Sequence, residues 1–304
     1  MSDRAPGDLD STVIGPRTFT WGARTYVMGI LNATPDSFSG DGLLAESATD
    51  PIAAAVLRAT AMADAGADIL DVGGESTRPG HAAVGADEEI ARVVPVIRAV
   101  RAALPGMPIS VDTTKAAVAT AALDAGADMV NDVWAVAEDD GLRGTAGGRR
   151  VPLIVMHNRA EARYADLLPE IVDDLRRAID RAVSAGVAWE DIVIDPGFGF
   201  GKTAEHNLAL LRDLSHLRVL GRPILVGTSR KSTLGRVLDL PADQRLEATL
   251  ATTTLAIASG ADIVRVHDVR ENVRAARMTD AVVRGSWVES GGRPGGGGWA
   301  GGGG

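Results

Sequence analysis

The sequence has no cysteine among its 304 residues, which excludes disulfide bonds, thiolate catalysis and zinc sites built on Cys ligands. No apolar run reaches 18 residues, so we expect no membrane-spanning helix and no membrane partner. The polar, acidic N-terminus MSDRAPGDLDST does not resemble a signal peptide, and we expect a cytoplasmic protein. Basic residues number 31 against 40 acidic ones, and the net charge of −9 argues against nucleic-acid binding.

Lysine is nearly absent. Three of the 31 basic residues are lysines, namely Lys115, Lys202 and Lys231, and the rest are arginines. Each lysine follows an expected strand. A lysine kept at such a place in an Arg-rich chain indicates a role that the wider guanidinium does not fit.

A short pattern repeats along the chain. Residues 65–68 and 125–128 read Ala-Gly-Ala-Asp and residues 259–262 read Ser-Gly-Ala-Asp, each before an apolar run, with a looser copy at 185–195. The pattern is typical of a helix that ends at glycine, followed by a tight turn and a buried strand. Apolar runs of four to six residues indicate strands covered on both faces.

Eight such strands are expected. They lie at 26–31, 68–72, 108–111, 128–131, 152–156, 191–194, 223–226 and 262–266. Helical periodicity fills the intervals, and Asp50 before Pro51 predicts a capped helix start. Eight strand–helix units over about 265 residues predict an α/β fold of the TIM (β/α)8 barrel type, with an open doubly wound sheet as the alternative.

The two ends of the chain are expected to differ from the barrel. We predict a flexible N-terminus at 1–17, a barrel at 18–288, and a disordered glycine-rich tail at 289–304, since 10 of the 36 glycines lie in 291–304. A short hairpin pairing 18–20 with 26–29 would lead into the core.

Polar side chains stand where the expected strands end, which is where TIM barrels place their chemistry. Asp112, Asn131, Asp195 and Lys231 follow four different strands. Carboxylates and an amide suit a flat heterocycle with N–H donors on one edge, and a lysine would donate to a ring oxygen or nitrogen. A salt-bridge network without a ligand is the alternative.

A second, cationic group consists of Arg78, Arg265 and His267, with Asn32 near by. Arg265 and His267 are two residues apart on one strand and so point to the same side. We expect them to bind phosphate or pyrophosphate, and Asn32 to serve as an oxygen ligand of Mg²⁺. For His267 alone, a capping or core role stays open, and for His157 a structural role is the better interpretation.

Glycine-rich loops follow several strands, and those after the first two are expected to be mobile covers. Three of the four phenylalanines, Phe38, Phe198 and Phe200, lie in such loops, where we expect them to stack on or fence an aromatic ligand. Residues 201–203 read Gly-Lys-Thr, but a phosphate loop needs glycine at 196, where Pro196 stands, so we expect no ATP site.

Eight ordered segments resemble the dihydropteroate synthases, the pterin-binding TIM barrels of folate synthesis. The segments are GILN at 29–32, TPDSFS at 34–39, GGESTRPG at 73–80, VDT at 111–113, NDV at 131–133, DPGFGFGK at 195–202, SRKS at 229–232 and RVHD at 265–268. The resemblance covers residues 27–285.

The resemblance implies a reaction and a set of residue roles. In the family, 6-hydroxymethyl-7,8-dihydropterin diphosphate loses diphosphate, and the amine of p-aminobenzoate attacks the cationic pterin to give 7,8-dihydropteroate. The pterin would be held by Asp112, Asn131, Asp195 and Lys231. The diphosphate would be held by Asn32, Arg78, Arg265 and His267, with Mg²⁺ at Asn32. The p-aminobenzoate site would consist of Thr77, Phe200, Lys231 and Ser232. A homodimer is also implied.

The sequence departs from the family pattern at two places. The first loop reads Gly-Asp-Gly at 40–42 where the family has Asp-Gly-Gly, so the shielding loop carboxylate is assigned to Asp41. After the fifth strand the chain has His157 followed by Asn158, not Met. Catalytic roles therefore fall to Asp112, Lys231, Asp41, Arg265 and His267.

Two alternatives to the synthase remain open. A methyltetrahydrofolate:corrinoid methyltransferase has a similar fold and pterin pocket, but it has no diphosphate for Arg265 and His267 to hold. A non-catalytic pterin-binding paralogue is favoured only by the displaced Asp41.

Overall fold

The computed structural model describes residues 9–33, 50–75, 84–135 and 141–285. Eight parallel strands form one sheet in the order β8-β7-β6-β5-β4-β3-β10-β9. Their bounds are β3 Tyr26–Asn32, β4 Ile69–Gly73, β5 Ile109–Asp112, β6 Met129–Asp132, β7 Leu153–Met156, β8 Ile192–Asp195, β9 Leu225–Val226 and β10 Ile263–Val266. The edge strands β8 and β9 meet through a parallel bridge between Ile194 and Ile224. The predicted barrel is confirmed, and the open sheet is excluded.

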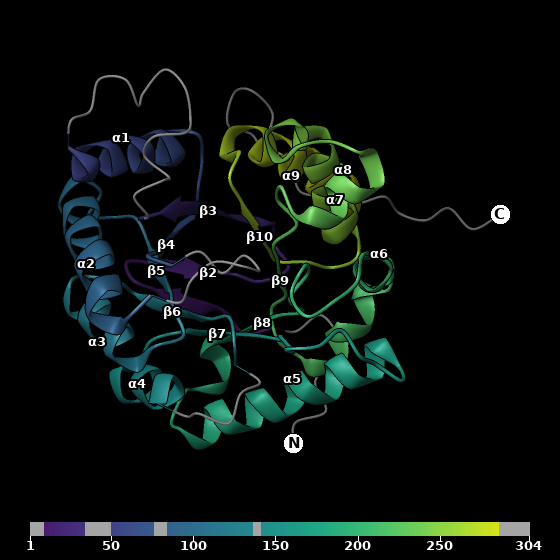
Figure 1. Cartoon of the computed structure of the whole chain (residues 1–304), viewed down its shortest axis with the longest axis horizontal. Helices are drawn as coiled ribbons and strands as arrows, with labels where there is room; N and C mark the ends of the chain where they lie inside the picture. The colour runs from purple at the N-terminus through teal and green to yellow at the C-terminus, as the bar shows by residue number, and fades with distance from the viewer. Residues whose placement is uncertain (1–8, 34–49, 76–83, 136–140, 286–304) are drawn as a thin grey trace.

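Helices ring the strands (Figure 1). They are α1 Pro51–Asp64, α2 Ala86–Ala103, α3 Ala116–Asp124, α4 Gly141–Arg149, α5 Leu167–Ser184, α6 Ala204–Arg212, α7 Ser232–Leu238, α8 Leu246–Ala258 and α9 Val269–Val283, with 3₁₀ turns η2 Trp189–Asp191, η3 Leu214–Leu220 and η4 Ala242–Gln244. The Asp50 carboxylate accepts the N–H of Ile52 with Pro51 in the first turn, which confirms the predicted cap. Within the described ranges, no helix combines the length and apolarity needed to cross a membrane.

The repeated glycines adopt the predicted helix-ending conformation. Gly66, Gly126, Gly186 and Gly260 have φ values of 101°, 112°, 96° and 100°. Only glycine adopts this region at little cost. The repeat therefore marks four helix-to-strand turns, as the sequence predicted.

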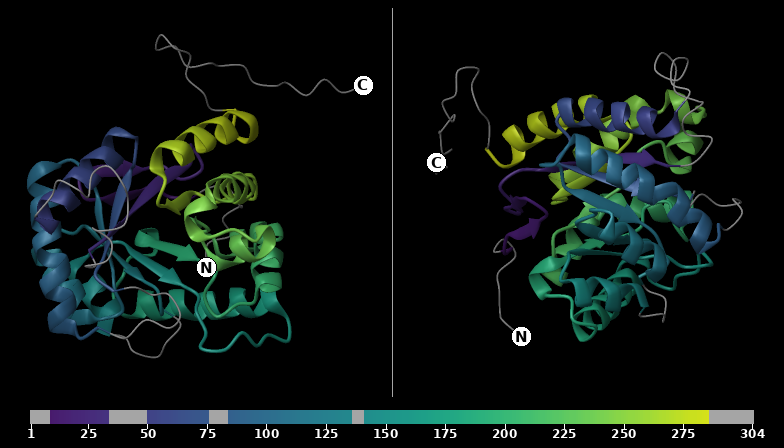
Figure 2. Two further views of the ribbon diagram at one scale, coloured as in Figure 1. Left: turned by 45° about the horizontal axis from the view of Figure 1, so that its top comes forward. Right: turned by 90° about the vertical axis from the view of Figure 1, so that its left-hand side faces the viewer.

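The hairpin differs from the one predicted. It pairs β1 Thr12–Ile14 with β2 Arg17–Phe19, turning at Gly15. The predicted pairing of 18–20 with 26–29 is wrong because the apolar run from Tyr26 forms a central barrel strand between β10 and β4. The hairpin lies at the N-terminal end of the barrel (Figure 2). Its apolar side chains belong to the same buried cluster as apolar side chains of the barrel interior. β1 thus lies within residues 1–17, the segment that the sequence analysis assigned to the N-terminus outside the barrel.

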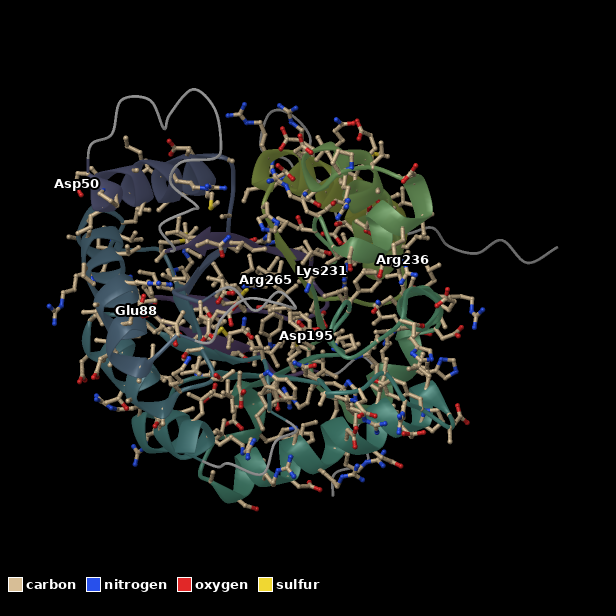
Figure 3. The ribbon with its side chains drawn as sticks, in the orientation of Figure 1. Asp50, Glu88, Asp195, Lys231, Arg236 and Arg265 are labelled. Atoms are coloured by element: carbon tan, nitrogen blue, oxygen red, sulfur yellow. The ribbon has the colours of Figure 1, made fainter. Side chains whose placement is uncertain are left out.

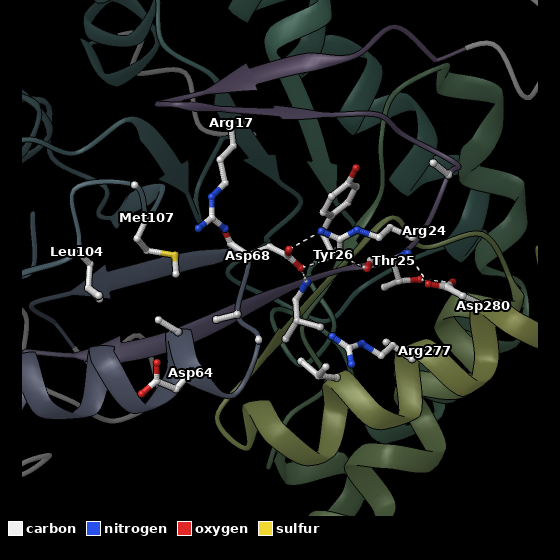
Figure 4. A pocket seen from close by; sticks show the side chains of 18 of the residues that line it. Arg17, Arg24, Thr25, Tyr26, Asp64, Asp68, Leu104, Met107, Arg277 and Asp280 are labelled. Atoms are coloured by element: carbon white, nitrogen blue, oxygen red, sulfur yellow. Dashed lines mark hydrogen bonds and ion pairs between the residues drawn. The ribbon is translucent and has the colours of Figure 1, made fainter. Parts of the chain in front are cut away.

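A pocket of about 1310 Å³ lies at this N-terminal end, between the hairpin and the starts of β3 and β4. Arg17, Arg24, Tyr26, Asp68 and Arg277 are among its lining residues (Figure 4). The predicted functional residues that the structure describes lie at the other ends of the strands. The tail predicted at 289–304 lies outside the part of the chain that the structure describes.

Candidate active site

Two layers of side chains fill the barrel, and the second layer forms the candidate site. Because side chains alternate along a strand, residues two apart point into the same interior. The apolar layer includes Met28, Ile69, Met129, Ile154, Val193, Leu225 and Ile263. Two residues further along, four of these strands present Asp71, Asn131, Asp195 and Arg265. A ring of polar groups therefore stands on an apolar floor.

Arg265 is the centre of this ring. Its Nε lies 2.5 Å from Oδ2 of Asp71, and its Nη2 lies 2.6 Å from Oδ2 of Asp112. Asn131 donates from Nδ2 to the same Asp71 oxygen at 3.2 Å. The guanidinium thus joins β10 to β4 and β5, and the Asp71 carboxylate joins β6 to the same cluster. Figure 3 shows Arg265, Lys231 and Asp195 gathered within the ring of helices, far from Asp50 and Glu88.

Each of the two carboxylates that contact Arg265 has one oxygen without a hydrogen-bond partner among the described residues. Asp71 is fully buried and Asp112 is 8% exposed, and the oxygen without a partner is Oδ1 in both. Burial raises the pKa of Asp112 to about 7, against the lowering effect of Arg265, and the charges of Asp71 and Glu89 raise it further. This arrangement holds negative charge with acceptors still available to a ligand.

Asp195 ends β8 and lies at the start of a loop of three left-handed glycines. Its Oδ1 accepts the N–H of Gly197 at 2.7 Å, and burial raises its pKa. Gly197 and Gly199 have φ values of 69° and 83°. A Cβ on Gly197 would lie 1.9 Å from the carbonyl oxygen of His157, and one on Gly199 would lie 2.9 Å from Cδ of Lys231. Only glycine fits at both positions.

Lys231 enters the site from the loop after β9. Its stem passes over Gly199, and its Nζ lies 3.7 Å from the centre of the Phe200 ring. The ammonium is attracted by the ring face, which fixes its direction. Ser232 follows as the first residue of α7 and is exposed. Lys231, Phe200 and Ser232 therefore border one side of the site.

The chain is similar to known proteins in both sequence and structure. The family model for pterin binding enzymes matches residues 28–267. A dihydropteroate synthase of Clostridium beijerinckii is 50% identical over 272 residues, covering 89% of this chain and 99% of that protein. The crystal structure of a dihydropteroate synthase from Clostridium difficile, in the presence of pteroic acid, has a TM-score of 0.83 at 50% identity and covers 88% of this chain and 99% of that one.

This chain belongs to the dihydropteroate synthase family. A Bacillus subtilis member is 48% identical over 276 residues, covering 91% of this chain and 95% of that protein. The resemblance inferred from the motifs is confirmed, and the chain is a transferase of folate synthesis.

The synthase site brings together most, but not all, of the residues predicted for it. The structure places Asp112, Asn131, Asp195, Lys231 and Arg265 at one end of the barrel. The two-group arrangement predicted for them differs from the one observed. Arg265 pairs with the acids, whereas His267 faces Ser229, whose Oγ lies 2.9 Å from Nδ1. The reason is that Arg265 is on β10 itself, while His267 follows its last residue.

Several predicted residues have other outcomes. Asp41, Thr77, Arg78 and Phe38 lie outside the described residues. Asn32 ends β3 and is partly buried.

Phe198 was expected to fence a ligand, and that prediction is wrong. It is 1% exposed and packs in the core between strands and helices, because the loop turns its side chain inward. His157 is fully buried, as its predicted structural role requires.

Sequence reasoning missed two groups. Asp71 was the stronger signal, since it is a charge within the apolar run that forms β4. The second group is centred on Lys115, whose Nζ lies 2.5 Å from Glu75 and 2.7 Å from the buried Glu89. Glu75 also accepts the N–H of Val84, so this cluster ties together two points of the chain on either side of residues 76–83.

Proposed function

We propose that this protein condenses 6-hydroxymethyl-7,8-dihydropterin diphosphate with p-aminobenzoate, giving 7,8-dihydropteroate and diphosphate. The observation that carries the proposal is the polar ring of Asp71, Asp112, Asn131, Asp195 and Arg265, bordered by Lys231. Xanthomonas albilineans relatives of known structure, 40% and 39% identical, were solved with 4-aminobenzoic acid and with 7,8-dihydropteroate.

The ring supplies complementary hydrogen-bond groups for a pterin. The carboxylates of Asp112 and Asp195 accept from N–H groups of the heterocycle, and the amide of Asn131 can both accept and donate. Lys231 donates to a ring oxygen or nitrogen. Because these groups stand on an apolar floor, the bicyclic ring lies flat in the mouth with its polar edge toward the strand ends.

The reaction separates charge, and the site carries groups for both halves. The carbon–oxygen bond to diphosphate breaks, and the electron pair leaves with the diphosphate. The pterin cation left behind is stabilised by the buried carboxylates of Asp71 and Asp112. The amine nitrogen of p-aminobenzoate then bonds to the cationic carbon and releases a proton.

The leaving diphosphate needs positive charge. We assign this role to His267, Arg265 and Arg78. Arg265 is held by two carboxylates, whose charges keep its pKa above the usual range against the effect of burial. It therefore stays protonated throughout the reaction and binds the anion as a fixed cation.

Asn32, which ends β3, would supply an oxygen ligand to a magnesium ion. Its side chain is partly buried at the strand end, and its amide oxygen is of the type that Mg²⁺ accepts. Mg²⁺ commonly takes few protein ligands together with phosphate oxygens. Bound there, it would neutralise charge on the leaving group.

The p-aminobenzoate would lie beside Lys231. Phe200 and Ser232 border this region, and Thr77 is assigned to it by its motif. We also propose that the protein acts in the cytoplasm as a homodimer, with the two small molecules as its only substrates.

The test is an assay of diphosphate release by the purified protein with Mg²⁺, with and without p-aminobenzoate. We expect diphosphate and dihydropteroate to appear together in equal amounts when both substrates are present. A folded sample that binds a pterin but releases neither product would instead be the non-catalytic paralogue. Methyl transfer to a corrinoid without diphosphate release would identify the methyltransferase alternative.

A further inference from the structure

Lys202 contacts the loop after β8 at several points. Its Nζ lies 3.1 Å from the carbonyl oxygens of both Gly197 and Phe200. A third contact, of 2.9 Å, reaches Nδ1 of His157 in the loop after β7. Burial lowers the pKa of Lys202 to about 7, against the raising effect of the Asp195 charge. In its charged form, Nζ has three N–H donors and no acceptor, so each donor has a partner and Nδ1 of His157 is the acceptor.

His157 can accept only if it carries its proton on the other nitrogen. Its Nε2 lies 3.1 Å from Oδ2 of Asp174 on α5, and a carboxylate in that position fixes the proton on Nε2. Burial lowers the pKa of His157 to about 3, and the charge of Lys202 lowers it further. The two contacts of the ring and its burial therefore favour the neutral form that carries its proton on Nε2.

The loop fixed by Lys202 carries two groups of the proposed site. Asp195 begins it, and the N–H of Gly197 donates to its carboxylate. Phe200 lies beneath Lys231. Two further hydrogen bonds hold the loop elsewhere, from the Tyr164 hydroxyl to the carbonyl of Gly201 and from the N–H of Gly199 to the side chain of Asn207. Lys202 is therefore one of several residues that anchor the loop.

We propose that Lys202 is a positioning residue that, anchored on the neutral ring of His157, fixes Gly197 and Phe200 and thereby the p-aminobenzoate side of the site. This inference rests on the proposed function. It also gives the lysine a role, since one compact Nζ reaches three acceptors from a single point, whereas a guanidinium spreads its donors over a planar fork.

The first experiment is steady-state kinetics of Lys202→Met, which keeps the length of the side chain and removes its donors. We expect the KM for p-aminobenzoate to rise at least tenfold. Pterin affinity, measured by calorimetry, should fall by a smaller factor than the KM rises, because Asp195 is itself the last residue of β8, and Asp112 and Asn131 lie on other strands. Arg177→Met is the matched control, because Arg177 contacts Asp174 from an exposed position but touches neither His157 nor the loop. It should behave as wild type.

The second experiment uses nitrogen NMR of His157 in the wild-type protein and so depends neither on activity nor on a variant that folds. We expect a neutral ring protonated at Nε2, unchanged between pH 5.5 and 8.5. A protonated ring, or a proton on Nδ1, would overturn the inference. So would an unchanged p-aminobenzoate KM in folded Lys202→Met, or an equal rise in Arg177→Met. A wild-type enzyme without synthase activity would instead refute the proposed function, leaving the His157 result to stand by itself.

Discussion

The two ends of the barrel treat buried carboxylates differently. At the N-terminal end, the aspartates of the repeated pattern, Asp68, Asp128 and Asp262, each accept the backbone N–H at the start of a neighbouring strand, from Val27, Ile109 and Ile224. Asp68 also forms a two-pronged ion pair with Arg24, and Asp128 pairs with Arg101. These charges join strands to one another.

At the C-terminal end, the acids keep oxygens that bind nothing in the described structure. Asp71, Asp112 and Glu89 each have one such buried oxygen. Leaving a buried acceptor without a partner costs about 1–3 kcal/mol. The difference indicates that the N-terminal acids serve stability and that the C-terminal acids are held ready for a ligand, at a cost to stability.

Asp195→Asn should have the largest effect on function. The amide replaces one acceptor with a donor, so we expect pterin binding to be abolished in calorimetry. The melting temperature should stay within a few degrees of wild type, since Oδ1 of Asn can still accept from Gly197. A large loss of stability would assign Asp195 to the structural class of acids instead.

Lys231→Ala should follow in size. The variant loses a charge-assisted hydrogen bond in a dry pocket and the contact to Phe200. We therefore expect kcat/KM to fall by the factor that corresponds to about 2–4 kcal/mol of activation free energy. Steady-state kinetics with both substrates measures this. Wild-type kinetics in the variant would refute the role of Lys231.

Asp128→Asn tests the other end of the barrel. The variant loses the ion pair with Arg101 and weakens the bond to Ile109, so the free energy of unfolding should fall by about 1–3 kcal/mol with kcat/KM unchanged. Urea denaturation provides the measurement. Asp124→Asn, which breaks an exposed ion pair with Arg149, is the control and should change stability by less than about 0.5 kcal/mol. A loss of activity in Asp128→Asn would contradict the division between acids that stabilise the N-terminal end of the barrel and acids that bind ligands at its C-terminal end.

The last prediction concerns the pH dependence that Asp112 confers. Its pKa is about 7 in the folded protein against an ordinary value of 3.8, so the folded state holds the proton more tightly. Its contribution to stability is therefore full below about pH 4 and is lost as pH rises through about 7. The groups facing it are Asp71 on β4, Glu89 on α2, Arg265 on β10 and Lys231.

Urea denaturation from pH 4 to pH 8, compared between wild type and Asp112→Asn, isolates this contribution. The wild type should lose stability relative to the variant as pH rises, and the difference should level off above about pH 7. Parallel curves would show that folding does not shift the pKa of Asp112.

The sequence predicted the strand ends well because two simple rules govern them. Parallel strands in a barrel all end on one side, and side chains alternate between its interior and its outside. These rules place Asp112, Asn131 and Asp195 together without any knowledge of contacts. They say nothing about Phe198, whose direction depends on how one glycine-rich loop turns.

The pairing of Arg265 with Asp71 depends on the last strand of the barrel lying beside the first. The two residues are 194 positions apart in the chain, and they come close because β3 pairs with β10 on one side and with β4 on the other. Local pattern cannot predict which acid a cation reaches across a barrel mouth. The same holds for the hairpin, where burial of a central strand outweighed a local turn.

The sequence by itself determined the number of strands, the helix ends at glycine and the set of chemical groups at the strand ends, because these follow from periodicity and from local backbone preferences. The tertiary structure alone decided which of those groups touch, which acids keep an oxygen unpaired and where Lys202 finds its three acceptors. Those outcomes depend on the closing of the sheet, which brings distant strands within hydrogen-bond distance in a space with little water.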